Sequence, residues 1–173
     1  VVSICRELEK DGNVVQAVHF NCPGKVVIAG SAEGVAKATV KLKENGAQRA
    51  MLLPVSAPFH STLMVPAAAR LKEALDKVEF KDAQIPVYSN VTGKPMKNKD
   101  EIKELLVKQA ASPVLWTNLA QNMTADGAGV IVEIGPGKTL CGFAKKITPD
   151  VSTLNVADME SLEKTIASLK EMN

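Results

Sequence analysis

The sequence of 173 residues has little charge excess of either sign: 21 lysines and arginines face 19 aspartates and glutamates, and the formal net charge is +2. Nucleic-acid-binding domains usually carry a strong basic excess, so this composition argues against DNA or RNA as a partner. With 46% hydrophobic and 23% charged residues the chain is typical of a soluble globular protein. Its length suits one sizeable domain, or a domain with a smaller lobe.

Long apolar runs and cysteine pairs are also missing. No uninterrupted apolar segment approaches the roughly 18 residues that span a bilayer, and no charged and then apolar signal segment opens the chain. We therefore expect no membrane partner and a cytoplasmic location, or an organelle after processing.

The cysteines, Cys5, Cys22 and Cys141, are far apart and form no C-x-x-C pair. This spacing indicates buried thiols in a reducing compartment, not a zinc site or a disulfide framework.

Motifs that mark a nucleotide site, a metal site or a serine nucleophile are absent. The G-P-G-K turn at 135–138 lacks the full G-x-x-x-x-G-K-[ST] pattern, and Leu140 stands where G-x-G-x-x-G needs its third glycine. A tight turn from a strand into a helix is the better interpretation. No G-x-S-x-G elbow is present. His19 and His60 have no carboxylate or thiolate at metal-ligand spacing, so we expect no metal site, and His19 is most simply a half-buried strand residue.

Hydrophobic periodicity in residues 1–55 predicts a small lobe. The expected order is a helix that ends near Gly12, strands at 14–20 and 25–29, a helix capped by Ser31 that ends near Gly46, and a strand at 50–54. This order is the βαββαβ ferredoxin-like unit without its first strand. The absent strand, the absent initial methionine and the helical start together favour the C-terminal part of a longer protein.

Residues 56–173 predict strands that alternate with helices, the pattern of an α/β core with a parallel sheet. The expected strands are 85–90, 129–134 and 152–156. One helix is expected after His60, with Pro66 in its first turn, and two more are expected after caps at Asn98 and Thr117. A further helix should run from 138 to Ile147, and a last helix should end the chain. The run at 129–134 is continuous and apolar, as in buried parallel strands. The predicted domains are therefore the incomplete ferredoxin-like lobe, 1–55, and the C-terminal part of an α/β core, 56–173.

His60 is the residue best placed to carry chemistry. It follows an apolar run and precedes a long amphipathic helix, and a histidine at such a junction can present its ring to a cleft for general acid–base work. The alternative is a loop residue with only a local hydrogen bond. A histidine base also needs a nucleophile within reach. Ser56 and Ser61 flank His60 but lie on no glycine-flanked elbow, so the nucleophile would come from elsewhere.

Four motifs follow one another along the chain: N-C-P-G-K-V-V-I-A-G at 21–30, L-P-V-S-A-P-F-H-S at 53–61, S-P-V-L-W at 112–116 and E-I-G-P-G-K-T-L at 133–140. In order and spacing they resemble the malonyl-CoA:acyl-carrier-protein transacylases, and the resemblance runs from end to end of the chain. It implies the C-terminal part of an acyltransferase fold, with a hydrolase-like parallel-sheet core and the small lobe. The family's G-H-S-x-G nucleophile elbow would lie upstream.

The resemblance implies an S-malonyltransferase of fatty acid or polyketide synthesis that works by a ping-pong cycle through a malonyl-serine. Its partners would be malonyl-CoA and acyl carrier protein, it would need no cofactor beyond the coenzyme A thioester that is its substrate, and it would be a monomer when complete. His60 would be the general base. Gln109 matches the position whose backbone carbonyl holds the family's histidine in the right tautomer.

Three further residues match substrate-binding positions of the family. Asn21 matches a position that lines the substrate channel, and Arg49 one that meets the phosphate of the coenzyme or carrier arm, although an exposed arginine after a helix is otherwise simply solvated. Phe59 resembles the bulky residue of malonyl-selective members, where one methyl group is worth about 1–3 kcal/mol of discrimination. Two alternatives stay open: a thioesterase that passes the acyl group to water, and a non-catalytic carrier-binding fragment.

Overall fold

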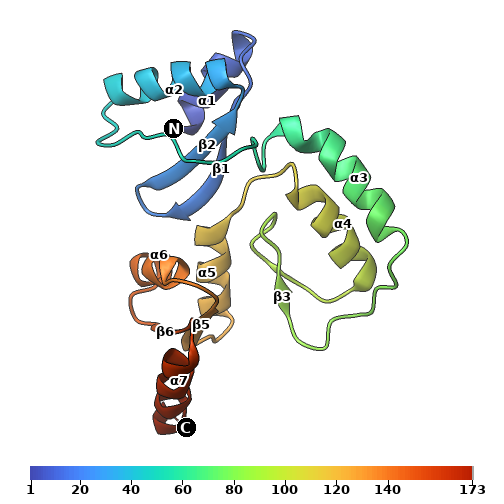
Figure 1. Ribbon diagram of the computed structural model, residues 1–173, viewed down its shortest axis with the longest axis vertical. Helices are drawn as coiled ribbons and strands as arrows, with labels where there is room; N and C mark the ends of the chain where they lie inside the picture. The colour runs from blue at the N-terminus through green and yellow to red at the C-terminus, as the bar shows by residue number, and fades with distance from the viewer. Residues whose placement is uncertain (173) are drawn as a thin grey trace.

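The computed structural model describes residues 1–172. Helices alternate with short strands, which confirms the α/β class. Figure 1 shows a hairpin with two helices at one end of the molecule, α3 and α4 beside it, and the C-terminal elements at the other end. The elements are α1 (Val2–Lys10), β1 (Val15–Cys22), β2 (Lys25–Gly30), α2 (Ala32–Glu44), the 3-10 helix η1 (Thr62–Met64), α3 (Val65–Leu75), β3 (Val87–Tyr88), β4 (Pro95–Met96), α4 (Lys99–Gln109), α5 (Trp116–Ala125), β5 (Val130–Ile134), α6 (Thr139–Ile147), β6 (Ser152–Val156) and α7 (Met159–Met172).

The N-terminal elements form around the antiparallel pair β1–β2, against which α1 and α2 pack. Its core joins the two helices to β1 through buried apolar side chains: Cys5, Leu8, Val15, Ala38 and Leu42. The side chain of Ser31 accepts a hydrogen bond from the Gly34 backbone N–H at 3.1 Å, which confirms the predicted cap of α2. Gly30 is required because a Cβ there would lie 2.0 Å from the Val14 carbonyl oxygen.

The prediction of a strand at 50–54 is wrong. The segment belongs to no strand of the structure, and its apolar residues are exposed, Leu52 by 73%. The second edge of β1 is met instead by Val114, whose N–H donates to the Val18 carbonyl at 2.8 Å and whose carbonyl accepts from the Phe20 N–H at 3.0 Å. A β-strand is defined by hydrogen bonds to a neighbouring strand, and the sequence of residues 50–54 does not show that Val114 already occupies the free edge of β1.

The α3 and α4 helices pack against each other, and their starts follow the sequence. Pro66 lies in the first turn of α3, and the Asn98 side chain accepts from the Asp100 N–H at 2.8 Å to cap α4, as predicted. The expected strand at 85–90 is reduced to the two residues of β3. Its partner β4 is equally short and begins with Pro95, which has no N–H to donate to the ladder.

The C-terminal elements contain the parallel pair β5–β6, in register from Val130 opposite Ser152 to Ile134 opposite Val156. The parallel arrangement is therefore confirmed, but the prediction that this strand is buried is wrong for the described chain, since Ile134 is 81% exposed. The predicted Thr117 cap is also wrong. Leu115 precedes the first residue of α5, and the Thr117 hydroxyl donates instead to the Phe20 carbonyl at 2.9 Å, which ties α5 to β1.

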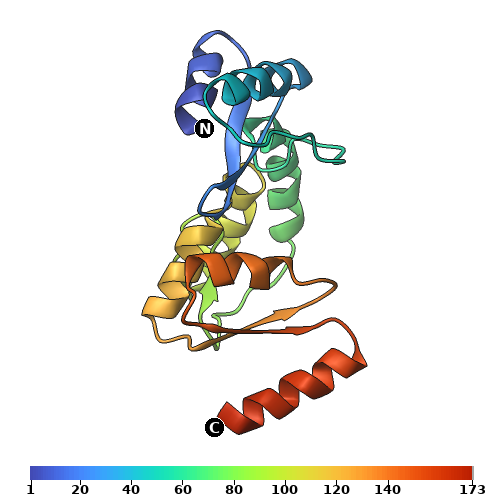
Figure 2. The same ribbon diagram turned by 90° about the vertical axis from the view of Figure 1, so that its left-hand side faces the viewer.

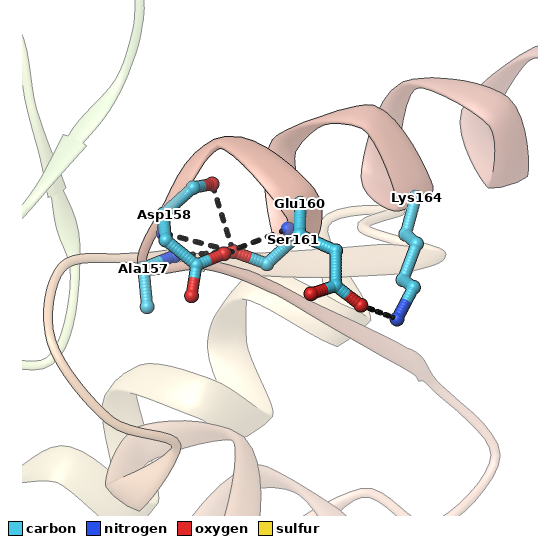
Figure 3. Close-up of polar contacts among 5 residues, drawn as sticks. All are labelled: Ala157, Asp158, Glu160, Ser161 and Lys164. Atoms are coloured by element: carbon cyan, nitrogen blue, oxygen red, sulfur yellow. Dashed lines mark hydrogen bonds and ion pairs between the residues drawn. The ribbon is translucent and has the colours of Figure 1, made fainter.

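Helix α7 lies at the opposite end of the molecule from α1 and α2 (Figure 2) and contacts β6. Its first turn is capped reciprocally: the Ser161 N–H donates to the Asp158 carboxylate at 2.8 Å, and the Ser161 hydroxyl oxygen accepts from the N–H groups of Ala157 and Asp158 at 2.9 Å (Figure 3). Glu160 and Lys164 form an ion pair one turn apart.

Candidate active site

The loop that carries His60 is fastened to the C-terminal end of α4. The His60 N–H donates to the Ala110 carbonyl at 3.2 Å, and the His60 ring nitrogen Nδ1 lies 2.7 Å from the backbone oxygen of Gln109. The next residue, Ser61, is fully buried and donates its hydroxyl to the Pro58 carbonyl at 2.6 Å. His60, which contacts these two carbonyls at the end of α4, has a left-handed backbone with φ +64°, which few residues other than glycine adopt.

This contact determines the protonation pattern of the ring. A carbonyl oxygen only accepts, so Nδ1 carries the proton of this hydrogen bond, and Nε2 is the ring nitrogen that is left to exchange protons. Gln109 is the last residue of α4, and the final carbonyls of a helix lack intrahelical partners and form the negative end of its dipole. A positive charge that the ring gains through Nε2 therefore lies beside a favourable field, although the acceptor itself is neutral.

Gln16 of β1 holds the other side of the loop. Its side-chain oxygen Oε1 accepts from the Thr62 N–H at 2.8 Å, and its Nε2 donates to the Glu9 carboxylate at 2.7 Å. The His60 loop is thereby linked through β1 to the end of α1. Sequence reasoning missed this bridge, because a glutamine in a strand carries no signal of a partner far along the chain.

His19, also on β1, contacts the candidate base directly. The centroids of the His19 and His60 rings are 4.9 Å apart and their planes are at 82°, an edge-to-face arrangement. Burial, and secondly the charge of His60, hold the pKa of His19 below its usual range, so His19 is neutral at neutral pH. The sequence placed the two histidines on different elements, and the structure brings their rings together.

A hollow of about 330 Å³ opens beside His60, between α1, β1 and the segment that follows α4. His60, Gln16, Phe20 and Arg6 are among the residues that line it. Polar and apolar groups thus meet at the ring, as expected of a site that receives a partly charged ligand.

The structure brings together two of the five predicted site residues, His60 and Gln109. Asn21 is half-buried near the end of β1, Phe59 is 48% exposed beside His60 in the chain, and Arg49 is exposed in the segment after α2. None of these three lines the hollow beside His60. Their predicted contacts with substrate therefore stay predictions.

The turn at 135–138 is a strand-to-helix connection, as expected, and the start of α6 is already occupied by the chain's own carboxylate. The Cys141 N–H donates to Glu133 Oε2 at 2.8 Å. Burial would raise the pKa of Glu133, but backbone hydrogen bonds from Cys141 and its neighbours outweigh burial and hold that pKa below its usual range. This helix start therefore binds an internal anion, and its geometry gives no support to a phosphate site.

Two further properties bear on function. Within residues 1–172, no group of three or more histidine, cysteine or acidic side chains could hold a metal ion. None of the helices in the described part of the chain is long and apolar enough to cross a membrane. The cysteines are free and buried, with Cys5 only 2% exposed, as the sequence predicts.

Comparison with known proteins gives consistent matches over nearly the whole chain. The model of the acyl transferase domain family matches residues 2–166. A malonyl CoA-acyl carrier protein transacylase of Bacillus subtilis is 47% identical over 96% of this chain and 53% of its own length, and that of Escherichia coli K12 is 41% identical over 98% and 54%. The chain thus spans about half the length of the curated relatives it matches.

Solved structures agree with these sequence matches. The crystal structure of a malonyl CoA-acyl carrier protein transacylase from Clostridium perfringens superposes with a TM-score of 0.93 at 42% identity, over 98% of this chain and 53% of that one. A second match, with a TM-score of 0.92 and 40% identity over 96% and 54%, is described as a type II PKS acyl-carrier protein in complex with its malonyl-transacylase.

Proposed function

The chain belongs to the acyl transferase domain family, and on this premise we propose that it supplies the histidine side of the active site of a malonyl-CoA:acyl-carrier-protein S-malonyltransferase. The observation that carries the proposal is the 2.7 Å contact between His60 Nδ1 and the Gln109 carbonyl, which leaves Nε2 free to take a proton. The names of the relatives support malonyl as the acyl group and acyl carrier protein as the acceptor. The activity is that of a full-length protein, because the chain covers about half of these relatives.

His60 acts twice in the proposed cycle. A serine from outside this chain loses its proton to His60 Nε2 and attacks the malonyl thioester of coenzyme A; the resulting imidazolium then gives the proton to the departing thiolate. In the second half, the phosphopantetheine thiol of the carrier gives its proton to Nε2 and attacks the malonyl-serine ester. The ester bond breaks, and the imidazolium returns the proton to the departing serine oxygen. Atoms and charges balance without any cofactor, and the reaction suits a cytoplasmic enzyme of fatty acid or polyketide synthesis.

Three residues take substrate-binding roles in this proposal. Phe59 is beside the base in the chain, and its half-exposed ring is available to narrow the acyl pocket. Arg49 is exposed, as a group that meets a phosphate of the coenzyme or the carrier arm must be. Asn21 lies near the end of the same strand that carries His19 and Gln16, and we assign it to the substrate channel from its match to the family position.

The test replaces His60 with asparagine in the full-length protein, built if necessary by placing this chain in the matching segment of the Bacillus subtilis relative. Asparagine tolerates a left-handed backbone, so the loop should keep its shape. General acid–base catalysis is worth about 10²–10⁴-fold, so malonyl transfer should fall by about that factor with a near-normal melting temperature. Transfer at the parent rate would contradict the role of His60.

Measuring both products in the parent protein separates the remaining alternatives. Formation of malonyl-carrier should exceed release of free malonate at ordinary carrier concentrations. Predominant malonate release would instead identify a thioesterase. A full-length protein that binds the carrier but neither transfers nor hydrolyses malonyl groups would indicate a non-catalytic carrier-binding role.

A further inference from the structure

The backbone of His19 is held between two neighbours. On one side it pairs with Val27 of β2, just after a shift in register between Ala17 and His19; on the other it forms a parallel bridge with Val114. Val114 follows α4 closely, and α4 ends in Gln109, whose carbonyl contacts His60. One short segment therefore fixes both the acceptor for His60 and the strand that carries His19.

The single hydrogen bond at Nδ1 does not by itself orient the His60 ring. The ring is held by its bond to Cβ and by this one hydrogen bond, both on the same side, so it can still rock about that side, and the rocking moves Nε2, which lies across the ring. The His19 ring meets the His60 ring edge to face at a centroid distance of 4.9 Å, so it supplies a second contact that opposes the tilt. Edge-to-face contacts between aromatic rings are favourable beyond the area they bury.

The contact is not a proton relay. His19 Nδ1 is buried and has no hydrogen-bond partner within residues 1–172, so the ring is placed by its backbone and by packing. The low pKa of His19 also keeps its ring neutral, and a neutral neighbour does not oppose a positive charge on His60. A protonated ring in this place would repel that charge.

We propose that His19 is a positioning residue for the reaction: its neutral ring, in edge-to-face contact with His60, holds Nε2 in line with the nucleophile. The inference rests on the proposed function, in which His60 is the base. It adds a residue of β1 to the catalytic arrangement, so the hairpin of the small lobe takes part in setting the geometry of the base. A misplacement of reacting groups by 1 Å can cost about 10²-fold in rate.

The experiment compares His19→Ala and His19→Phe in the full-length protein. His19→Ala removes the ring contact and should lower kcat by about tenfold to hundredfold, with KM for malonyl-CoA little changed, because binding groups are untouched. His19→Phe keeps an aromatic ring there and should restore kcat to within about threefold. It should also raise the melting temperature, because the unpaired buried nitrogen is gone.

A matched control removes a ring elsewhere. Phe143 of α6 is half-buried and packs under the Lys25 ammonium at 4.8 Å, so Phe143→Ala loses a comparable contact and some stability. Its kcat should stay at the parent value. If His19→Ala lowers the melting temperature like this control but leaves kcat unchanged, or if His19→Phe is as slow as His19→Ala, the proposal is overturned.

Nitrogen-15 NMR of the histidine rings keeps this result separate from the proposed function. In the parent protein His60 should show one tautomer, protonated at Nδ1. His19→Ala should move its ring signals toward values of mixed tautomers, and His19→Phe should not. Such a shift in a protein that transfers no malonyl group would contradict the function and support the contact, whereas unchanged His60 signals in His19→Ala would refute the contact.

Discussion

Gln16 joins three parts of the molecule through two hydrogen bonds, and removing these bonds measures how firmly the His60 loop is held. Gln16→Ala removes the bond to the Thr62 N–H, 2.8 Å, and the bond to the Glu9 carboxylate, 2.7 Å. A neutral hydrogen bond contributes about 0.5–1.5 kcal/mol and one to a charged group about 1.5–3 kcal/mol. Both hydrogen bonds are partly open to water, and water can replace part of what they contribute. We therefore expect the free energy of unfolding to fall by about 1–2 kcal/mol.

A sharper version of this experiment exchanges the amide and the carboxylate between Gln16 and Glu9. Gln16→Glu keeps an acceptor for Thr62 but sets two carboxylates against each other, and should cost about 2 kcal/mol at pH 7. Glu9→Gln added to it restores a donor facing an acceptor. The double-mutant cycle should therefore show a coupling energy of at least about 1 kcal/mol.

Urea unfolding and malonyl transfer in the full-length protein are the two measurements. Because Thr62 is two residues from His60, kcat should follow stability of the loop: lower in Gln16→Glu and recovered in the double variant. Equal unfolding midpoints for Gln16→Glu with and without Glu9→Gln would refute the bridge, and unchanged kcat in every variant would refute its link to the site.

Two further predictions follow from backbone acceptors and donors. Gln109→Ala should change kcat by less than about threefold, because His60 contacts the main-chain carbonyl of this residue and the substitution removes only a 3.4 Å hydrogen bond from the Asn90 side chain. A fall in kcat beyond about a hundredfold would show that the Gln109 side chain takes part in the reaction. Glu133→Gln should lower the melting temperature at pH 7. The folded-state pKa of Glu133 lies below that of an unfolded glutamate, so the contribution of its carboxylate to stability is fully present at neutral pH and is lost as the pH falls through the folded pKa. Melting curves between pH 7 and 3 should converge; a constant difference would contradict this cause.

The elements that the sequence predicts well are those decided by neighbouring residues. Ser31 and Asn98 cap the helices that follow them because a short polar side chain reaches N–H groups two or three residues ahead. The contact of His60 with Gln109 was predicted only through the family resemblance, because 49 positions separate the two residues and no local pattern links them.

The errors share a physical cause, which is dependence on a distant partner. The segment 50–54 has the apolar residues of a strand but no strand beside it, since Val114 meets the edge of β1. Thr117 has the chemistry of a cap but bonds to Phe20 instead. His19 and Gln16 carried no signal for the same reason: each is an ordinary strand residue until the chain brings His60 and Thr62 against it.

The C-terminal end of α4 is closed by His60 itself, through its backbone N–H on Ala110 and its ring on Gln109. Most helices end on a residue that serves only the helix, often glycine. Here the same residue satisfies two carbonyls at the helix end and presents the base, so the assembled state of the site can be followed without substrate. Slow hydrogen exchange at the His60 amide reports that the loop is seated on α4, and its exchange rate gives the fraction of molecules in which the base is in place.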